Sequence, residues 1–80
     1  MLEELKTEHK VVGVKQLKKA ILAGKARRVF LAQNADPKLT EPVAELCVAQ
    51  GVSCVWVKTM SEIGKACGID VGAAAAGTVQ

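Results

Sequence analysis

Three glycines in this 80-residue chain mark the ends of predicted helices. Each of them follows a stretch with the apolar spacing of an α-helix. Gly24, Gly51 and Gly68 stand where a helix ends best on a residue that adopts positive φ. Between these helices, residues 27–33 and 53–57 have continuous apolar centres, which is typical of strands covered on both faces. Two strand–helix–strand steps of this length indicate a parallel pair of strands. The chain therefore predicts an α/β fold.

The complete set of expected elements gives a three-layer α/β/α sandwich around a small mixed sheet, formed by residues 1–80 as one domain. The alanine-rich tail is ambiguous, and we expect a loop over residues 69–73 followed by a strand. We expect Thr40 and Ser61 to cap the second and third long helices. The expected elements are helices at residues 2–8, 14–23, 40–50 and 62–67 and strands at residues 11–12, 27–33, 53–57 and 74–79.

Composition argues against several classes of protein. No run of about 18 uncharged apolar residues is present, so we expect no transmembrane helix and no membrane partner. Residues 1–4 lack the layout of a signal peptide, which predicts a cytoplasmic protein. Three cysteines without a C-x-x-C pair fit neither a zinc site nor a redox motif, so buried, reduced thiols are expected.

Catalytic motifs are also missing from the sequence. We find no Ser/Cys–His pairing, no H-E-x-x-H helix and no Walker-type phosphate loop. A small nucleotide-binding or transfer enzyme would lack its residues, so we expect no enzyme activity, no small-molecule substrate, no cofactor and no metal.

The basic residues are concentrated in one segment. Residues 10–28 carry seven basic side chains and no acidic one, and the net charge is +5 over residues 1–40 but −2 over residues 41–80. At about 100° per residue, Leu17 and Ile21 fall on one face of a helix, and the opposite face carries Lys15, Gln16 and Lys19. Such a face is suited to a polyanion, although a solvated face that only maintains solubility has the same pattern.

If the polyanion is RNA, its recognition is expected to rest on shape and phosphates. The two aromatic residues, Phe30 and Trp56, lie in strands predicted to be buried and are too few for a stacking platform. Gln16 and Asn34 offer amide donors and acceptors, and Gly13 permits close approach of a backbone. The segment 69–73 either covers an unstacked base or is simply a tight connection.

Four motifs in this order resemble the large-subunit ribosomal protein seven-Ae family, whose members bind kink-turn RNA. The motifs are Gly13-x-Lys15-Gln16-x-x-Lys19, residues 31–37, Leu46-Cys47 and residues 63–71. The chain length resembles the bacterial YbxF-like branch. The resemblance implies an α/β/α sandwich and RNA contacts around tandem sheared G·A pairs and an extruded nucleotide. The implied contact residues are Gly13, Val14, Lys15, Gln16, Lys19, Gln33, Asn34, Ala35, Asp36, Ile69, Asp70, Val71, Gly72 and Ala73.

Two departures from the family pattern affect this surface. Archaeal members commonly have Thr-Asn-Glu after the glycine, where this chain has Val14-Lys15-Gln16, so a hydroxyl contact is lost and a charge replaces an amide. The familiar Glu-Asp pair after the second strand is Gln33-Asn34 here, which removes negative charge near RNA.

Two functional hypotheses follow. The first is a non-enzymatic protein that binds kink-turn RNA and associates with the ribosome. The second is a protein-interaction module whose apolar C-terminal strand pairs as an edge strand with a partner, while the lysines provide only solubility.

Overall fold

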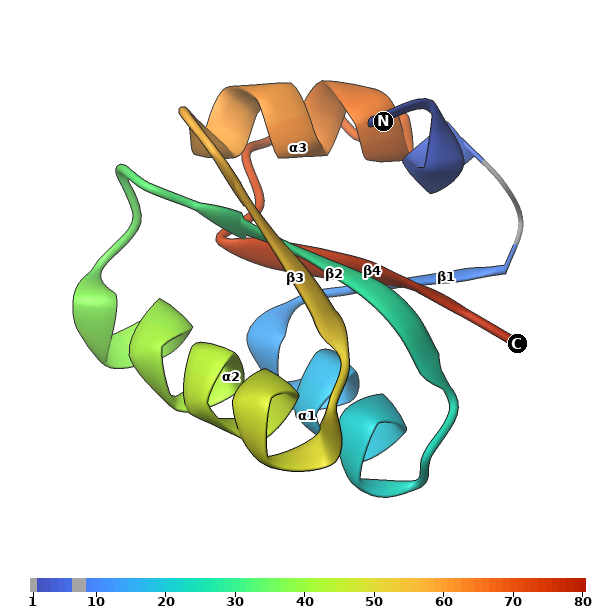
Figure 1. Cartoon of the computed structure of the whole chain (residues 1–80). Helices are drawn as coiled ribbons and strands as arrows, with labels where there is room; N and C mark the ends of the chain where they lie inside the picture. Colours follow the sequence, from blue (N-terminus) through green and yellow to red (C-terminus); the bar gives the residue numbers. More distant parts are fainter. Residues whose placement is uncertain (1, 7–8) are drawn as a thin grey trace.

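The computed structural model describes residues 2–6 and 9–80, which form a mixed sheet with helices on both faces (Figure 1). This arrangement confirms the predicted α/β/α sandwich. The end of the first expected helix, Thr7 and Glu8, lies outside the described residues, and its beginning is a 3-10 helix. In chain order the elements are η1 (Leu2–Lys6), β1 (Lys10–Val12), α1 (Val14–Leu22), β2 (Ala26–Ala32), α2 (Pro37–Gln50), β3 (Ser53–Val57), α3 (Met60–Cys67) and β4 (Ala75–Val79).

The four strands lie in the order β1-β4-β2-β3. β2 and β3 pair in parallel through the intervening α2, as the sequence predicts, and β4 is antiparallel to both of its neighbours. The expectation that the C-terminal strand lies at an edge is therefore wrong. Both sides of β4 are hydrogen-bonded within the sheet, so it has no free edge with which to capture a partner strand.

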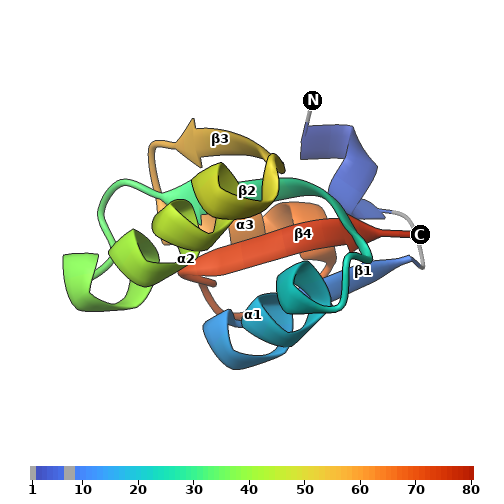
Figure 2. The same cartoon turned by 60° about the horizontal axis from the view of Figure 1, so that its bottom comes forward.

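Helices cover both faces of the sheet, with α1 and α2 on one face and η1 and α3 on the other (Figures 1 and 2). Residues of β2 alternate between these two cores. Phe30 and Ala32 pack with η1 and α3, whereas Val29 and Leu31 pack with α1 and α2. This double burial explains the continuous apolar centre of the strand.

β3 was also expected to be a buried strand, and this prediction is wrong. The strand forms one edge of the sheet, and Trp56 is 45% exposed although its register partner Leu31 is fully buried. Phe30 is buried as expected. Two of the three free cysteines, Cys47 and Cys67, are buried and Cys54 is half-buried.

Both predicted N-cap residues are wrong, because each helix is capped by a residue earlier in the chain than predicted. Asp36, not Thr40, caps α2, because its carboxylate accepts the Lys38 N–H at 3.0 Å and Pro37 is pre-organised to begin a helix. Thr59, not Ser61, caps α3. Its hydroxyl accepts the Glu62 N–H at 3.2 Å while the Glu62 carboxylate accepts the Thr59 N–H at 3.3 Å, which is a reciprocal capping box.

Candidate nucleic-acid interface

The beginning of β4 is the point at which the predicted binding segments meet. Three backbone hydrogen bonds join residues 73–75 to other parts of the chain. They run from Ala73 N–H to Met60 O at 3.0 Å, from Ala32 N–H to Ala74 O at 2.9 Å, and from Gly13 N–H to Ala75 O at 2.9 Å. The start of α1, the end of β2, the start of α3 and the segment before β4 therefore share one end of the sheet.

All three α-helices begin at this end, at the left of the sheet in Figure 1. A helix N-terminus carries a partial positive charge and four backbone N–H groups without intrahelical partners. Side chains cap two of the three termini, through Asp36 in α2 and Thr59 in α3. In α1 the N-cap is Gly13, and in the part of the chain that the structure describes this terminus has no side-chain cap hydrogen bond.

The first turn of α1 is consequently open and positive. Gly13 has φ 102°, a conformation that favours glycine. The first amide with an intrahelical acceptor is that of Leu17, which donates to Gly13 O at 3.1 Å. The turn contains no acidic residue. A nearby acceptor would therefore meet unused N–H groups and a favourable dipole.

The side chains of α1 are distributed as its periodicity predicts. Leu17 and Ile21 are fully buried, whereas Lys15, Gln16 and Lys19 are exposed. Within residues 2–6 and 9–80, neither Lys15 nor Lys19 has an ion-pair partner. Val14 is half-buried at the helix start. The helix thus presents two cations and an amide beside its open N-terminus.

The turn after β2 holds the second predicted segment, and its residues have different environments. Gln33 is exposed, and its N–H donates to Val57 O at 2.7 Å. Asn34 Oδ1 accepts the Met60 N–H at 2.9 Å, which leaves the amide NH2 group as a donor at the surface. Ala35 belongs to the core and Asp36 is used as the cap of α2. Gln33 and Asn34 are therefore the side chains of this segment that offer hydrogen-bond donors to a ligand.

Residues 69–72 lie along α3 and form the third predicted segment. Ile69 N–H donates to Gly64 O at 3.0 Å, and a Cβ on Gly64 would overlap Val71 O. Val71 is 69% exposed and Asp70 and Gly72 are exposed, whereas Ala73 is buried. The segment is thus a mainly apolar surface fixed against a helix.

Sequence reasoning missed the two residues that hold this segment, Gly64 and Met60. An isolated glycine within a helical pattern was the available signal for Gly64, because such a glycine commonly permits close packing. Nothing local marks Met60, whose backbone bonds to Asn34 and Ala73 from two other segments.

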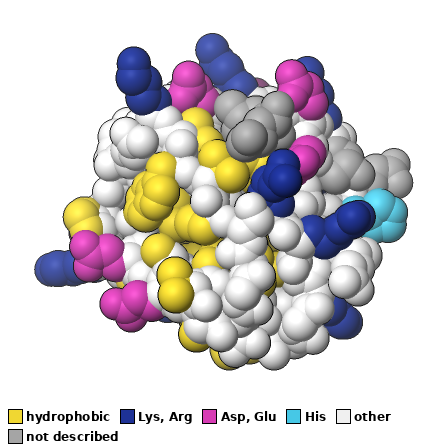
Figure 3. All heavy atoms as spheres, in the orientation of Figure 1, with side chains coloured by type: hydrophobic (Ala, Val, Ile, Leu, Met, Phe, Trp, Pro, Cys, Tyr) yellow, Lys and Arg dark blue, Asp and Glu magenta, His cyan; other side chains and the backbone are white. Residues whose placement is uncertain are grey.

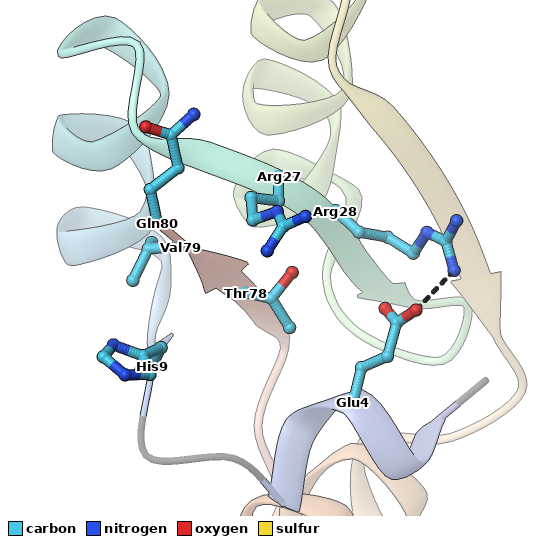
Figure 4. Close-up of a pocket in the computed structure, with 7 residues that line it drawn as sticks. All are labelled: Glu4, His9, Arg27, Arg28, Thr78, Val79 and Gln80. Carbon is cyan, nitrogen blue, oxygen red and sulfur yellow. Dashed lines mark hydrogen bonds and ion pairs between the residues drawn. The ribbon is translucent and has the colours of Figure 1, made fainter.

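A second candidate surface lies at the opposite end of the sheet, where Glu4, His9, Arg27, Arg28, Thr78, Val79 and Gln80 line a hollow (Figure 4). Arg28 Nη1 donates to Glu4 Oε1 at 2.7 Å, so part of its positive charge is already neutralised. In the described part of the chain, no cluster of His, Cys, Asp and Glu is arranged to hold a metal ion. The end of the sheet at which α1 begins is therefore the better candidate for binding a polyanion.

Comparison with known proteins agrees with this fold. Residues 2–80 match the "Ribosomal protein L7Ae/L30e/S12e/Gadd45 family". A bacterial protein called RNA-binding protein TTE2299, from Caldanaerobacter subterraneus subsp. tengcongensis, is 43% identical over 70 residues, covering 88% of this chain and 85% of the relative. The chain belongs to this family, in its bacterial YbxF-like branch.

More distant members are also similar. Large ribosomal subunit protein eL8 of Halobacterium salinarum is 38% identical over 68 residues, which cover 84% of this chain and 57% of that protein. The solved structure of the Giardia lamblia 15.5kD RNA binding protein superposes with a TM-score of 0.92 at 25% identity, covering 99% of this chain and 70% of the other.

Proposed function

We propose that this protein is a non-enzymatic RNA-binding protein that recognises kink-turn RNA, with residues 1–80 acting as one binding domain. Family membership supports RNA binding, since the bacterial relative TTE2299 is called an RNA-binding protein and the relative eL8 is a ribosomal protein. One structural observation supports the recognition of kink-turn RNA in particular. The single α-helix N-terminus left without a side-chain cap in the described chain is also the one beside Lys15, Gln16 and Lys19.

This surface matches the features of a kinked RNA. Tandem sheared G·A pairs expose guanine acceptors in the groove, which suit the Lys15 ammonium and the Gln16 amide. Phosphates near the pairs suit the open N–H groups of α1 and the Lys19 charge. The apolar surface of residues 69–72 suits the extruded nucleotide. The bent RNA is a minor state that differential binding would stabilise.

The departures from the archaeal pattern change the expected balance of contacts. Lys15 is a strong donor to guanine acceptors but does not accept a hydrogen bond, so this protein should rely more on charge. Gln33 and Asn34 remove the repulsion that two carboxylates would exert on phosphates. The relative eL8 is a ribosomal protein, which favours a ribosomal kink-turn as the natural ligand.

Binding to two RNAs tests the proposal: a kink-turn duplex and the same duplex with its G·A pairs replaced. Lys15→Ala and Gln16→Ala should weaken binding to the kink-turn more than to the replaced duplex. Lys25→Ala is the matched control, because Lys25 lies at the opposite end of the sheet, where its carbonyl accepts the Gln80 N–H. It should weaken both RNAs alike.

Salt provides an independent measurement of the phosphate contacts. If about five phosphates are neutralised, the slope of log affinity against log salt should be roughly −3.5 to −4.5. Equal affinity for the kink-turn and for the duplex without G·A pairs would refute kink-turn recognition. A stable complex with protein and none with RNA would refute RNA binding as well.

A further inference from the structure

The single tryptophan of the chain lies on the edge strand, at the end of the sheet that holds the proposed interface. Trp56 is 45% exposed, and the next residue, Val57, accepts the Gln33 N–H through its carbonyl at 2.7 Å. Its side chain lies on the face of α1 and α2, because its register partner Leu31 packs in that core. The indole is therefore beside the interface but separate from residues 69–72, which pack on α3.

The surroundings of Trp56 suit a nucleotide. The segment from Gly51 to Ser61 contains Lys58 and no carboxylate, and Lys58 is exposed. Lys38 is exposed in the first turn of α2, which begins at the same end of the sheet, and the exposed Glu41 and Glu45 follow it along that helix. Aromatic side chains near cations are the usual platforms for unpaired bases, since every base has a π-face.

The exposed indole alone is small for a protein interface. Hydrophobic side chains gather beside β3 in the space-filling view (Figure 3), yet an indole at this exposure offers on the order of 100 Å². Stable protein interfaces bury about 800 Å² on each partner. One nucleobase, in contrast, is comparable in size to one indole.

We propose that Trp56 is a stacking platform for an unpaired nucleobase in a single-stranded extension of the bound RNA. This inference rests on the proposed RNA binding and extends the interface along the edge of the sheet, away from the kink. It also reverses two sequence-based expectations, that Trp56 is a core residue and that the aromatic residues are too few for a stacking platform, because a single exposed indole is enough for one base.

Three synthetic kink-turn RNAs test the proposal: one with a blunt stem, one with four unpaired adenosines at the 5′ end and one with four at the 3′ end. At least one extension should increase the affinity of the wild-type protein. Trp56→Ala should remove that increase, a loss of roughly 5- to 150-fold, and should leave the blunt RNA unaffected. Trp56→Phe, which keeps an aromatic face, should retain part of it.

Fluorescence of the unaltered protein gives a second measurement that needs no variant. Because Trp56 is the single tryptophan, its emission reports this site alone. The extended RNA should quench that emission and protect it from acrylamide, and the blunt RNA should do neither.

Two results would overturn the proposal. One is equal affinity for blunt and extended RNAs with Trp56 accessible to acrylamide in both complexes. The other is self-association of the RNA-free protein with Trp56 protected, which would assign the indole to a second copy. Failure to distinguish the blunt kink-turn from a duplex without G·A pairs would instead contradict the proposed function.

Discussion

Gly64→Ala tests whether close packing on α3 holds residues 69–72 in place. A Cβ at Gly64 would overlap the carbonyl oxygen of Val71 and lie 3.2 Å from the Gly72 Cα. These are backbone atoms, so the added methyl group is accommodated only if the segment moves away from the helix. The substitution should therefore alter the segment without changing any side chain proposed to contact RNA.

The expected stability change combines two opposing contributions. Forcing a methyl group into packed backbone costs about 1–3 kcal/mol. Alanine in place of glycine within a helix recovers about 0.8–1 kcal/mol. The free energy of unfolding should fall by about 1 kcal/mol, and a domain of this size then loses about 4–8 °C in Tm.

Gly51→Ala provides the matched control. Gly51 has φ 67° at the end of α2, where a Cβ would meet nothing within 4 Å, so the cost is backbone strain of about 1–2 kcal/mol. The two variants should have similar Tm values. Gly64→Ala alone should weaken kink-turn binding, by about tenfold, as expected for losing roughly 1.4 kcal/mol of contact with the extruded nucleotide.

Amide hydrogen exchange identifies the cause. Ile69 N–H and Ala73 N–H donate to Gly64 O and Met60 O, respectively. Both amides should exchange faster in Gly64→Ala than in the wild type, and at the wild-type rate in Gly51→Ala. If Gly64→Ala raises the Tm, keeps both amides protected and binds RNA like the wild type, then the close packing does not position this segment and the reasoning is refuted.

Three other predictions concern stability. Burial raises the pKa of Cys47 to about 11, so between pH 9 and 11 the thiol loses its proton in the unfolded chain but keeps it in the folded one. The free energy of unfolding, measured by denaturant titration, should therefore fall over that range. It should fall less steeply in Cys47→Ala. Asn34→Ala should cost about 1 kcal/mol by leaving the Met60 N–H without its acceptor, and Asn34→Asp should restore the wild-type Tm. Glu4→Gln should cost less than about 1 kcal/mol, a difference that 1 M salt abolishes in paired melting curves, because the ion pair with Arg28 is partly exposed.

The parts of the fold that depend on local chemistry were predictable from the sequence. Gly24, Gly51 and Gly68 all have positive φ at the ends of helices, and the parallel pairing of β2 with β3 follows from the helix between them. Strand order was not predictable. β2 and β3 have similar apolar centres, but only pairing on both sides distinguishes an inner strand from an edge strand.

In the candidate site, too, local features were predictable from the sequence and contacts between distant residues were not. The face of α1 that carries Lys15 and Lys19 follows from helical periodicity, and the structure places both side chains at the surface. The capping roles were less accessible, because Asp36 and Thr40 are both good N-cap residues and the choice between them depends on where the preceding strand ends. The hydrogen bond from Met60 to Asn34 spans 26 residues and has no local signature.

The small residues of β4 are the link between the fold and the proposed interface. β4 is covered on both faces, and a Cβ on Gly77 would lie 2.6 Å from Leu17 Cδ1 and 3.0 Å from Arg28 O. α1 can therefore pack closely only because this strand lacks large side chains. Ala75 O holds Gly13 N–H at 2.9 Å, which fixes the open helix terminus against the strand. Side-chain volume in a strand that has no proposed RNA contact thus determines where the first turn of α1 meets its ligand.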